Sequence, residues 1–308
     1  MSKFNINKSS VKNLGAFKIL ETYNHPFAQI IKLESSKGEI FFLKHFIYPK
    51  NYLINEYDIS PAYKKDRLRV YLKFHSLIGR NRKLAKYLVK IVYFSFKDDL
   101  LLTKGNRNEV AFSDLIIKNI INKKQFTEIA KLTEYLIGSN LKINSQSEND
   151  KNKIILNLKL RLQFKKPLLY ILKEQEVIDI ISNLGKMNYI SHGDLQPKNI
   201  VFSRGKMEIF DFEEGFLAPQ GWDAGFLWGN IFYLSAKNKK TLRKHQKVFK
   251  NIIHKIIHKQ LRSNIAKITG AIVMMRLKMF PLIKLNSKQS EMLTELAKDF
   301  IKLYKKNE

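Results

Sequence analysis

The sequence predicts an α+β protein with two lobes, a small antiparallel-sheet N-lobe and a larger, mainly helical C-lobe. Strand-like runs separated by turn signals fill residues 15–103, whereas helical periodicity dominates after Gly105. Hydrophobic residues make up 44% of the 308-residue chain, with 21 Phe and 13 Tyr, which is typical of a folded protein with a large core. We place the boundary near Lys104, giving lobes of 1–104 and 105–308.

Five strands are expected in the first lobe. AFKILETY (16–23) and FAQIIKLES (27–35) are followed by a turn at Gly38 and by EIFFLKHF (39–46). YLVKIVYFSF (87–96) and LLLTKG (100–105) flank a KDD turn, which predicts a hairpin. The turn between the first two strands contains NHPF, so no glycine-rich phosphate loop is visible there.

Helices are expected in the second lobe at FTEIAKLTEYLIG (126–138), EVIDIISNLGKM (176–187) and 241–262. In the last of these, apolar pairs recur every four residues from 248 to 257. This spacing predicts one continuous helix with a buried stripe and a basic outer face.

The net charge of +29 is unevenly distributed. From Ala224 to Ser290 there is no Asp or Glu but there are fifteen Lys and Arg residues. Such a surface attracts phosphates, nucleic acid or anionic lipid headgroups, although a biased residue usage would also raise the lysine content. The basic helices of 237–262 are therefore candidates for contact with an anionic membrane, with nucleic acid as a weaker alternative.

The chain contains no cysteine, which excludes disulfides, thiolate nucleophiles and Cys-ligated metal centres. Its first residues lack the apolar run of a signal peptide, and the most apolar stretch, 265–283, is interrupted by Lys267, Arg276 and Lys278. We expect a cytoplasmic protein, with peripheral attachment to the inner membrane face as a further hypothesis.

The segment ISHGDLQPKNIVF (190–202) followed by IFDFEE (209–214) has the strongest chemical signature. NIVFS and MEIFD predict a hairpin around a three-residue turn, in which Asn199 falls opposite Asp211. An amide oxygen and a carboxylate side by side are suitable ligands for Mg²⁺. Asp194, in the loop before the hairpin, would then accept a proton from an attacking hydroxyl. Each polar residue alone is as well explained by local backbone capping, but the combination favours a site.

HGDLQPKN followed by IFDFE resembles the catalytic loop and metal-binding segment of the aminoglycoside phosphotransferase and choline kinase branch of the protein-kinase-like superfamily. The resemblance implies a protein-kinase-like fold, ATP and Mg²⁺ as cofactors, and the following roles: Asp194 as catalytic base, Asn199 and Asp211 as Mg²⁺ ligands, His192 as an organiser of the loop, and Asp223 in GWDAG as its support through backbone N–H bonds.

The resemblance also assigns residues to nucleotide binding. Lys44 in FFLKHF corresponds to the lysine that contacts the α- and β-phosphates. Its helix partner is either Glu56 or Asp66, and we favour Glu56. Protein kinases carry a lysine two positions after the catalytic Asp; here that position is Gln196, and Lys198 is the candidate for reaching the γ-phosphate.

The leading hypothesis is an ATP-dependent kinase that phosphorylates a hydroxyl of a small molecule. Only nine residues separate Glu213 from Asp223, too few for the peptide-docking activation loop of protein kinases. Because the region after Asp223 lacks acids, we expect a sugar or sugar-containing acceptor, with anionic or lipid-linked molecules among the options, rather than a cationic aminoglycoside. The alternative is a non-catalytic kinase-like protein whose basic helices bind nucleic acid or an anionic membrane.

Overall fold

The computed structural model describes residues 16–25, 28–47, 67–139, 141, 159–185 and 187–302. The chain divides into two compact units. Unit 1 comprises the described residues up to Arg69 together with Val89–Glu109, and unit 2 comprises Val70–Leu88 and the residues from Val110 onward. Residues 70–88 therefore group with the helical unit although they precede Lys104 in the chain.

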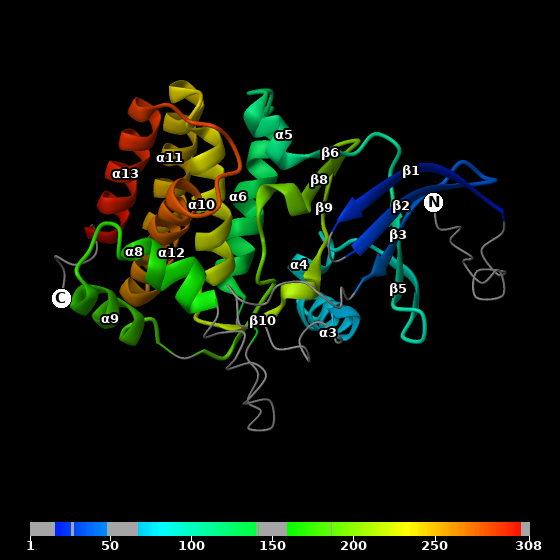
Figure 1. Cartoon of the computed structure of the whole chain (residues 1–308), viewed down its shortest axis with the longest axis horizontal. Helices are drawn as coiled ribbons and strands as arrows, with labels where there is room; N and C mark the ends of the chain where they lie inside the picture. Colours follow the sequence, from blue (N-terminus) through cyan, green and yellow to red (C-terminus); the bar gives the residue numbers. More distant parts are fainter. Residues whose placement is uncertain are drawn as a thin grey trace. The chain divides into compact units, whose positions relative to one another are not determined.

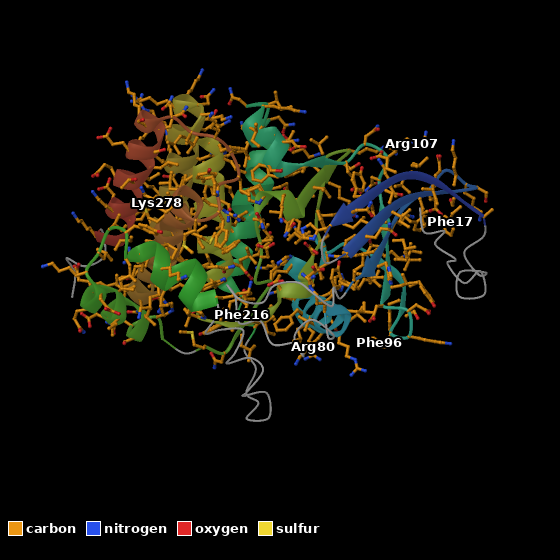
Figure 2. All side chains as sticks on the ribbon, in the orientation of Figure 1. Phe17, Arg80, Phe96, Arg107, Phe216 and Lys278 are labelled. Atoms are coloured by element: carbon orange, nitrogen blue, oxygen red, sulfur yellow. The ribbon has the colours of Figure 1, made fainter. Side chains whose placement is uncertain are left out.

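Unit 1 is a five-stranded antiparallel sheet with the strand order β1-β2-β3-β5-β4 (Figure 1). The strands are β1 Phe17–His25, β2 Ala28–Ser35, β3 Ile40–Phe46, β4 Ile91–Ser95 and β5 Leu100–Gly105, as the sequence predicted. One face of the sheet forms a core of Ile31, Leu33, Phe41, Leu43, Leu100 and Leu102, against which Phe17 packs (Figure 2). Lys44 alternates with Leu43 and so belongs to the opposite face, where its Nζ lies 5.1 Å from the centre of the Phe46 ring.

Unit 2 is mainly helical (Figure 1). Most of α3 belongs to it. The helical segments are α3 Arg67–Gly79, α4 Arg82–Ala85, α5 Phe112–Ile117, α6 Lys123–Gly138, η4 Leu160–Lys165, α8 Lys166–Leu168, α9 Glu174–Ser182, η5 Pro197–Asn199, η6 Phe212–Glu214, α10 Trp222–Ser235, α11 Lys239–His254, α12 Lys259–Lys278 and α13 Ser287–Lys302. Helices α10 and α12 are buried along most of their length and form the centre of the unit.

Two glycines allow α10 and α12 to pack closely. A Cβ atom at Gly225 would lie 2.7 Å from the Cβ of Ile268, and one at Gly229 would lie 2.6 Å from the Cβ of Ile272. Both distances are shorter than real Cβ contacts. The two helices therefore form a tightly packed pair, and larger residues at 225 or 229 would force them apart.

Short strands in unit 2 carry the candidate site. β7 Tyr189–Ser191 pairs with β10 Phe216–Ala218, and β8 Ile200–Ser203 lies between β6 Val110–Ala111 and β9 Lys206–Ile209. The predicted β8–β9 hairpin is present, but its predicted register was wrong by one residue. Ser203 pairs with Lys206, not Met207, so Phe210 rather than Asp211 pairs with Asn199.

The hairpin turn explains the error in register. Arg204 and Gly205 have φ values of 48° and 77° and form a two-residue turn. Positive φ at both central positions matches the strand twist of two-residue hairpins, which usually contain Asn-Gly or Asp-Gly. Arg-Gly is not among the typical pairs, so nothing in the residue types excluded Lys206 from the turn.

The predicted continuous helix at 241–262 was also wrong. Helix α11 ends at His254 and α12 begins at Lys259. The apolar stripe holds within α11, where Leu242, Phe249, Ile252 and Ile253 are buried. Within the break the pattern fails, because Ile257 is 88% exposed.

The two candidate partners of Lys44, Glu56 and Asp66, lie outside the described residues. Within the described part of the chain, no helix is long and apolar enough to cross a membrane.

Candidate active site

Asp223 holds the loop that begins at the end of β7. It lies in the first turn of α10 and is buried. Its carboxylate accepts hydrogen bonds from the His192 backbone N–H at 2.8 Å, the Gly193 N–H at 3.2 Å and the Ser191 hydroxyl at 2.7 Å. Charge-assisted bonds of this kind fix the path of the backbone before Asp194.

Gly193 is required where the loop approaches the segment after Asp211. Its φ is 81°, and a Cβ there would lie far inside van der Waals contact with the Glu214 carbonyl oxygen.

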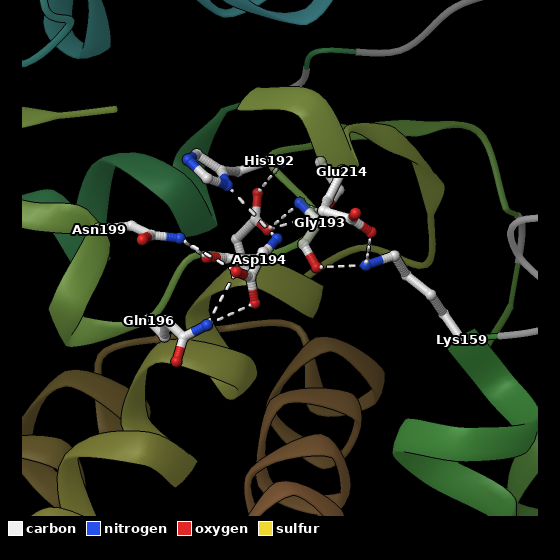
Figure 3. Close-up of polar contacts among 9 residues, drawn as sticks. Lys159, His192, Gly193, Asp194, Gln196, Asn199 and Glu214 are labelled. Atoms are coloured by element: carbon white, nitrogen blue, oxygen red, sulfur yellow. Dashed lines mark hydrogen bonds and ion pairs between the residues drawn. The ribbon is translucent and has the colours of Figure 1, made fainter. Parts of the chain in front are cut away.

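Lys159 joins the loop to the same segment after Asp211. Its Nζ donates to the Gly193 carbonyl over 2.9 Å and lies 3.2 Å from the Glu214 carboxylate (Figure 3). Lys159 is itself buried, and its Nζ lies 5.4 Å from the centre of the Phe216 ring.

The half-buried carboxylate of Asp194 is held by two side-chain amides (Figure 3). Gln196 Nε2 donates to Oδ1 at 2.7 Å and to Oδ2 at 2.8 Å, and Asn199 Nδ2 donates to Oδ2 at 3.1 Å. Asn199 Nδ2 also donates to the Asp194 carbonyl over 2.8 Å. Oδ2 thus accepts two described hydrogen bonds and Oδ1 accepts one. The available acceptor capacity of this carboxylate is therefore greatest at Oδ1.

His192 connects the loop to the end of β9. Its Nδ1 accepts from the Asp194 backbone N–H at 3.3 Å, so the proton is on Nε2, which donates to the Phe210 carbonyl over 2.9 Å. The ring lies 4.4 Å from that of Phe212, which also makes edge contacts with Tyr71 and His75 of α3. His192 is buried and orders the loop from within.

Asn199 and Asp211 lie at the open end of the β8–β9 hairpin. The Phe210 N–H donates to the Asn199 carbonyl over 3.2 Å, and Asp211 follows with a left-handed backbone, φ 74° and ψ 54°. Because Asn199 Nδ2 faces Asp194, its Oδ1 faces away from that carboxylate. One amide oxygen and one carboxylate suit Mg²⁺, which usually completes its shell with water and phosphate oxygens.

The ligand set does not resemble an all-protein metal cage. In the residues that the structure describes, no three His, Cys, Asp or Glu side chains gather as a metal-binding group.

Tyr71 lies beside Asp211. Burial raises the pKa of the Tyr71 hydroxyl above its usual range, the charges of Asp211 and Glu213 act in the same direction, and a hydrogen bond with the Asp211 backbone opposes them. Tyr71 therefore remains a neutral hydroxyl next to the candidate ligand.

Behind Asp194, Gln196 contacts the buried Arg276 of α12. Arg276 Nη2 donates to Gln196 Oε1 over 3.1 Å, and its Nε donates to Asn230 Oδ1 over 2.7 Å. Nη1 donates to the Phe280 carbonyl over 3.3 Å. Burial lowers the pKa of Arg276, and the charge of Asp194 opposes that shift.

The structure thus brings together His192, Asp194, Asn199, Asp211 and Asp223 within unit 2. Lys198 is exposed on the short turn η5, and Lys44 lies in unit 1. Sequence reasoning missed Lys159 and Arg276. Arg276 could have been found as a candidate because it is a charged residue within the apolar stretch 265–283, where a buried cation needs polar partners.

No protein-family model matches the sequence, and the search of curated proteins found no match. Solved structures do match. The amicoumacin kinase hAmiN, in complex with AMP-PNP, Ca²⁺ and Ami, superposes with a TM-score of 0.52 at 14% identity, over 98% of this chain and 94% of that one. Choline kinase LicA from Streptococcus pneumoniae gives 0.50 at 13% identity, over 97% and 99% of the two chains. Aminoglycoside phosphotransferase APH(4)-Ia gives 0.52 at 10% identity, over 97% and 98%. The chain therefore has the protein-kinase-like fold found in these phosphotransferases, as the catalytic-loop motif predicted.

Proposed function

We propose that this protein is an ATP-dependent phosphotransferase that moves the γ-phosphate of ATP to a hydroxyl of a small molecule. The observation that carries the proposal is the Asp194 carboxylate, which two amides hold in one orientation while Oδ1 accepts a single described hydrogen bond. A fixed carboxylate with one oxygen available is what a general base for hydroxyl attack requires. The fold supports the same reaction class, because the neighbours named above are kinases.

In this proposal, Asp194 Oδ1 accepts the proton of the attacking hydroxyl, and Asn199 and Asp211 hold Mg²⁺. When bound, the ion would neutralise charge on the phosphate oxygens. Lys44 and Lys198 are proposed to contact the phosphates of ATP. His192 acts indirectly, since both of its ring nitrogens are used to hold the loop.

The proposed acceptor is a neutral or anionic molecule, such as a sugar. From Ala224 to Ser290 no acid is present, and the buried cations nearest to the loop are Lys159 and Arg276. A polycationic aminoglycoside would find few carboxylates to pair with there. We therefore expect sugars to be phosphorylated faster than aminoglycosides in a panel that measures ADP release, and faster turnover of aminoglycosides would overturn this assignment.

Asp194→Asn tests the mechanism most directly. The substitution preserves size but removes the proton acceptor, so we expect turnover to fall by about a factor of 10² to 10⁴. Binding should persist, because the change leaves Lys44 and Asp211 in place. ATP with Mg²⁺ should raise the melting temperature of wild type and variant alike, since a ligand that binds only the native state stabilises it. Unchanged turnover in a folded Asp194→Asn protein would refute the role of Asp194.

A second candidate function, attachment to an anionic membrane surface, is favoured by one observation. Ile257, 88% exposed between α11 and α12, lies beside the exposed lysines Lys255 and Lys259 and the exposed His258. An apolar side chain among cations suits the headgroup region of an anionic bilayer. We expect cosedimentation with phosphatidylglycerol vesicles that weakens with salt and with Ile257→Asp. Equal binding to neutral phosphatidylcholine vesicles would exclude this function.

A further inference from the structure

Arg276 and Gln196 form a hydrogen-bonded chain that ends on the Asp194 carboxylate. The Arg276 guanidinium donates to Gln196 Oε1, and Gln196 Nε2 donates to both oxygens of Asp194. Both ends of the Gln196 amide are therefore used, and they impose one orientation on it. An amide flip would place a donor against Arg276 and an acceptor against Asp194.

The charge of Arg276 has no direct partner of opposite sign in the described part of the chain. Its described acceptors are the neutral oxygens of Gln196, Asn230 and Phe280. A buried cation of this kind is costly unless its charge is compensated. Asp194 is the acid whose charge acts on Arg276, and Gln196 lies between the two. The neutral amide thus transmits the interaction between a buried cation and a half-buried carboxylate.

The other contacts of Arg276 hold it rigidly. It is on α12, which packs closely against α10, and Asn230 of α10 accepts its Nε–H. The Asn230 amide is itself fixed, because its Nδ2 donates to the Phe226 carbonyl over 2.9 Å. The α10–α12 pair, through Arg276, therefore helps to fix the position of Gln196, in addition to the loop that carries it.

We propose that Gln196 and Arg276 are positioning residues that hold the Asp194 carboxylate with Oδ1 toward the acceptor hydroxyl. The inference rests on the proposed phosphotransfer function. With water as the acceptor, the water oxygen bonds to the γ-phosphorus of ATP, the bond from that phosphorus to the β–γ bridging oxygen breaks, and Asp194 takes the water proton. The products are ADP and inorganic phosphate, so ATP hydrolysis measures the step without a known acceptor.

Gln196→Glu separates positioning from packing. The new side chain has nearly the same shape and gains a direct ion pair with Arg276, so folding should be preserved. It can no longer donate to Asp194 and repels it instead. We expect kcat for ATP hydrolysis with Mg²⁺ to fall by about 10- to 100-fold, the scale of a small displacement of a catalytic group, with KM for ATP within about twofold of wild type.

A double-mutant cycle of Gln196→Met and Arg276→Met tests whether Arg276 acts through Gln196. If it does, the loss of kcat in the double variant will be far smaller than the product of the two single losses. Thr133→Val serves as the matched control for lost buried hydrogen bonds, since Thr133 accepts from Trp228 Nε1 over 3.0 Å away from the chain of bonds to Asp194. We expect its kcat to equal that of wild type. If Arg276→Met does not fold, Arg276→Lys takes its place in the cycle.

The outcomes separate this inference from the function on which it rests. If the wild-type protein shows no ADP release that depends on Asp194, either with water or with the sugar panel as acceptor, both proposals are overturned. Hydrolysis that is lost in Asp194→Asn but retained in Gln196→Glu would overturn the positioning role alone. Independent, multiplicative losses in the cycle would show that Arg276 does not act through Gln196.

Discussion

Substituting Asp223 by Asn should destabilise unit 2 although the side chain keeps its shape. The carboxylate accepts from two backbone N–H groups and one hydroxyl, and the His192 N–H has Asp223 as its described acceptor. An asparagine offers one oxygen, so its NH₂ group must face a donor. Hydrogen bonds to a charged group contribute about 1.5 to 3 kcal/mol each; at least one of the three is lost at the NH₂ group, and the others lose the negative charge of their acceptor. Relief of carboxylate burial offsets part of this loss, and we expect a net cost of about 2 to 4 kcal/mol.

The assay follows from the position of the tryptophans. The chain has two, Trp222 and Trp228, and both lie in α10 with Asp223. Tryptophan fluorescence during urea unfolding therefore reports on unit 2 at the support of the loop. Ser191→Ala removes a single bond to Asp223 and the bond accepted from the Gly193 N–H, which keeps Asp223 as an acceptor, so it should cost only about 1 kcal/mol. An Asp223→Asn protein within about 0.5 kcal/mol of wild type, a change typical of neutral surface positions, would refute the proposed support.

Two further predictions concern residues that hold the fold. Gly193→Ala should abolish ATP turnover and lower the melting temperature, because the added Cβ meets the Glu214 carbonyl; a variant with normal turnover would show that the loop can move aside. Burial, with a smaller contribution from Lys244, lowers the pKa of His245 from 6.5 to about 3. The buried imidazole therefore resists protonation in the folded state. Its contribution to the free energy of unfolding is fully present above pH 6.5 and is lost as the pH falls toward 3. At pH 4.5 the loss is on the order of 3 kcal/mol, and His245→Phe should remove this part of the difference between urea titrations at pH 7.5 and 4.5. An equal pH dependence in wild type and variant would contradict it.

The strands of unit 1 could be predicted because each is a short apolar run bounded by a turn signal. The register of the β8–β9 hairpin could not, because it depends on which of two turn lengths Arg204 and Gly205 adopt. A slip of one residue reverses which face each side chain occupies. The left-handed backbone at Asp211 was equally invisible in the sequence.

The candidate site was only partly predictable for a different reason. Asp194, Asn199 and Asp211 lie within eighteen residues and follow a recognisable pattern, whereas Lys159 and Arg276 reach the loop from 34 and 80 residues away through tertiary packing. The break between α11 and α12 at residues 255–258 could not be predicted from the periodicity either, because the apolar pairs continue through these residues in the sequence.

The left-handed backbone of Asp211 affects how this position tolerates mutation. A φ of 74° is readily accepted by glycine and next best by asparagine and aspartate, whereas β-branched residues are strained there. Mg²⁺, in contrast, requires an oxygen ligand, which glycine cannot supply. In a library selected only for folding, position 211 should therefore accept Gly, Asn and Asp, and a further selection for turnover should retain Asp. A descendant of this protein that lost its chemistry could keep its fold with a single codon change at this residue.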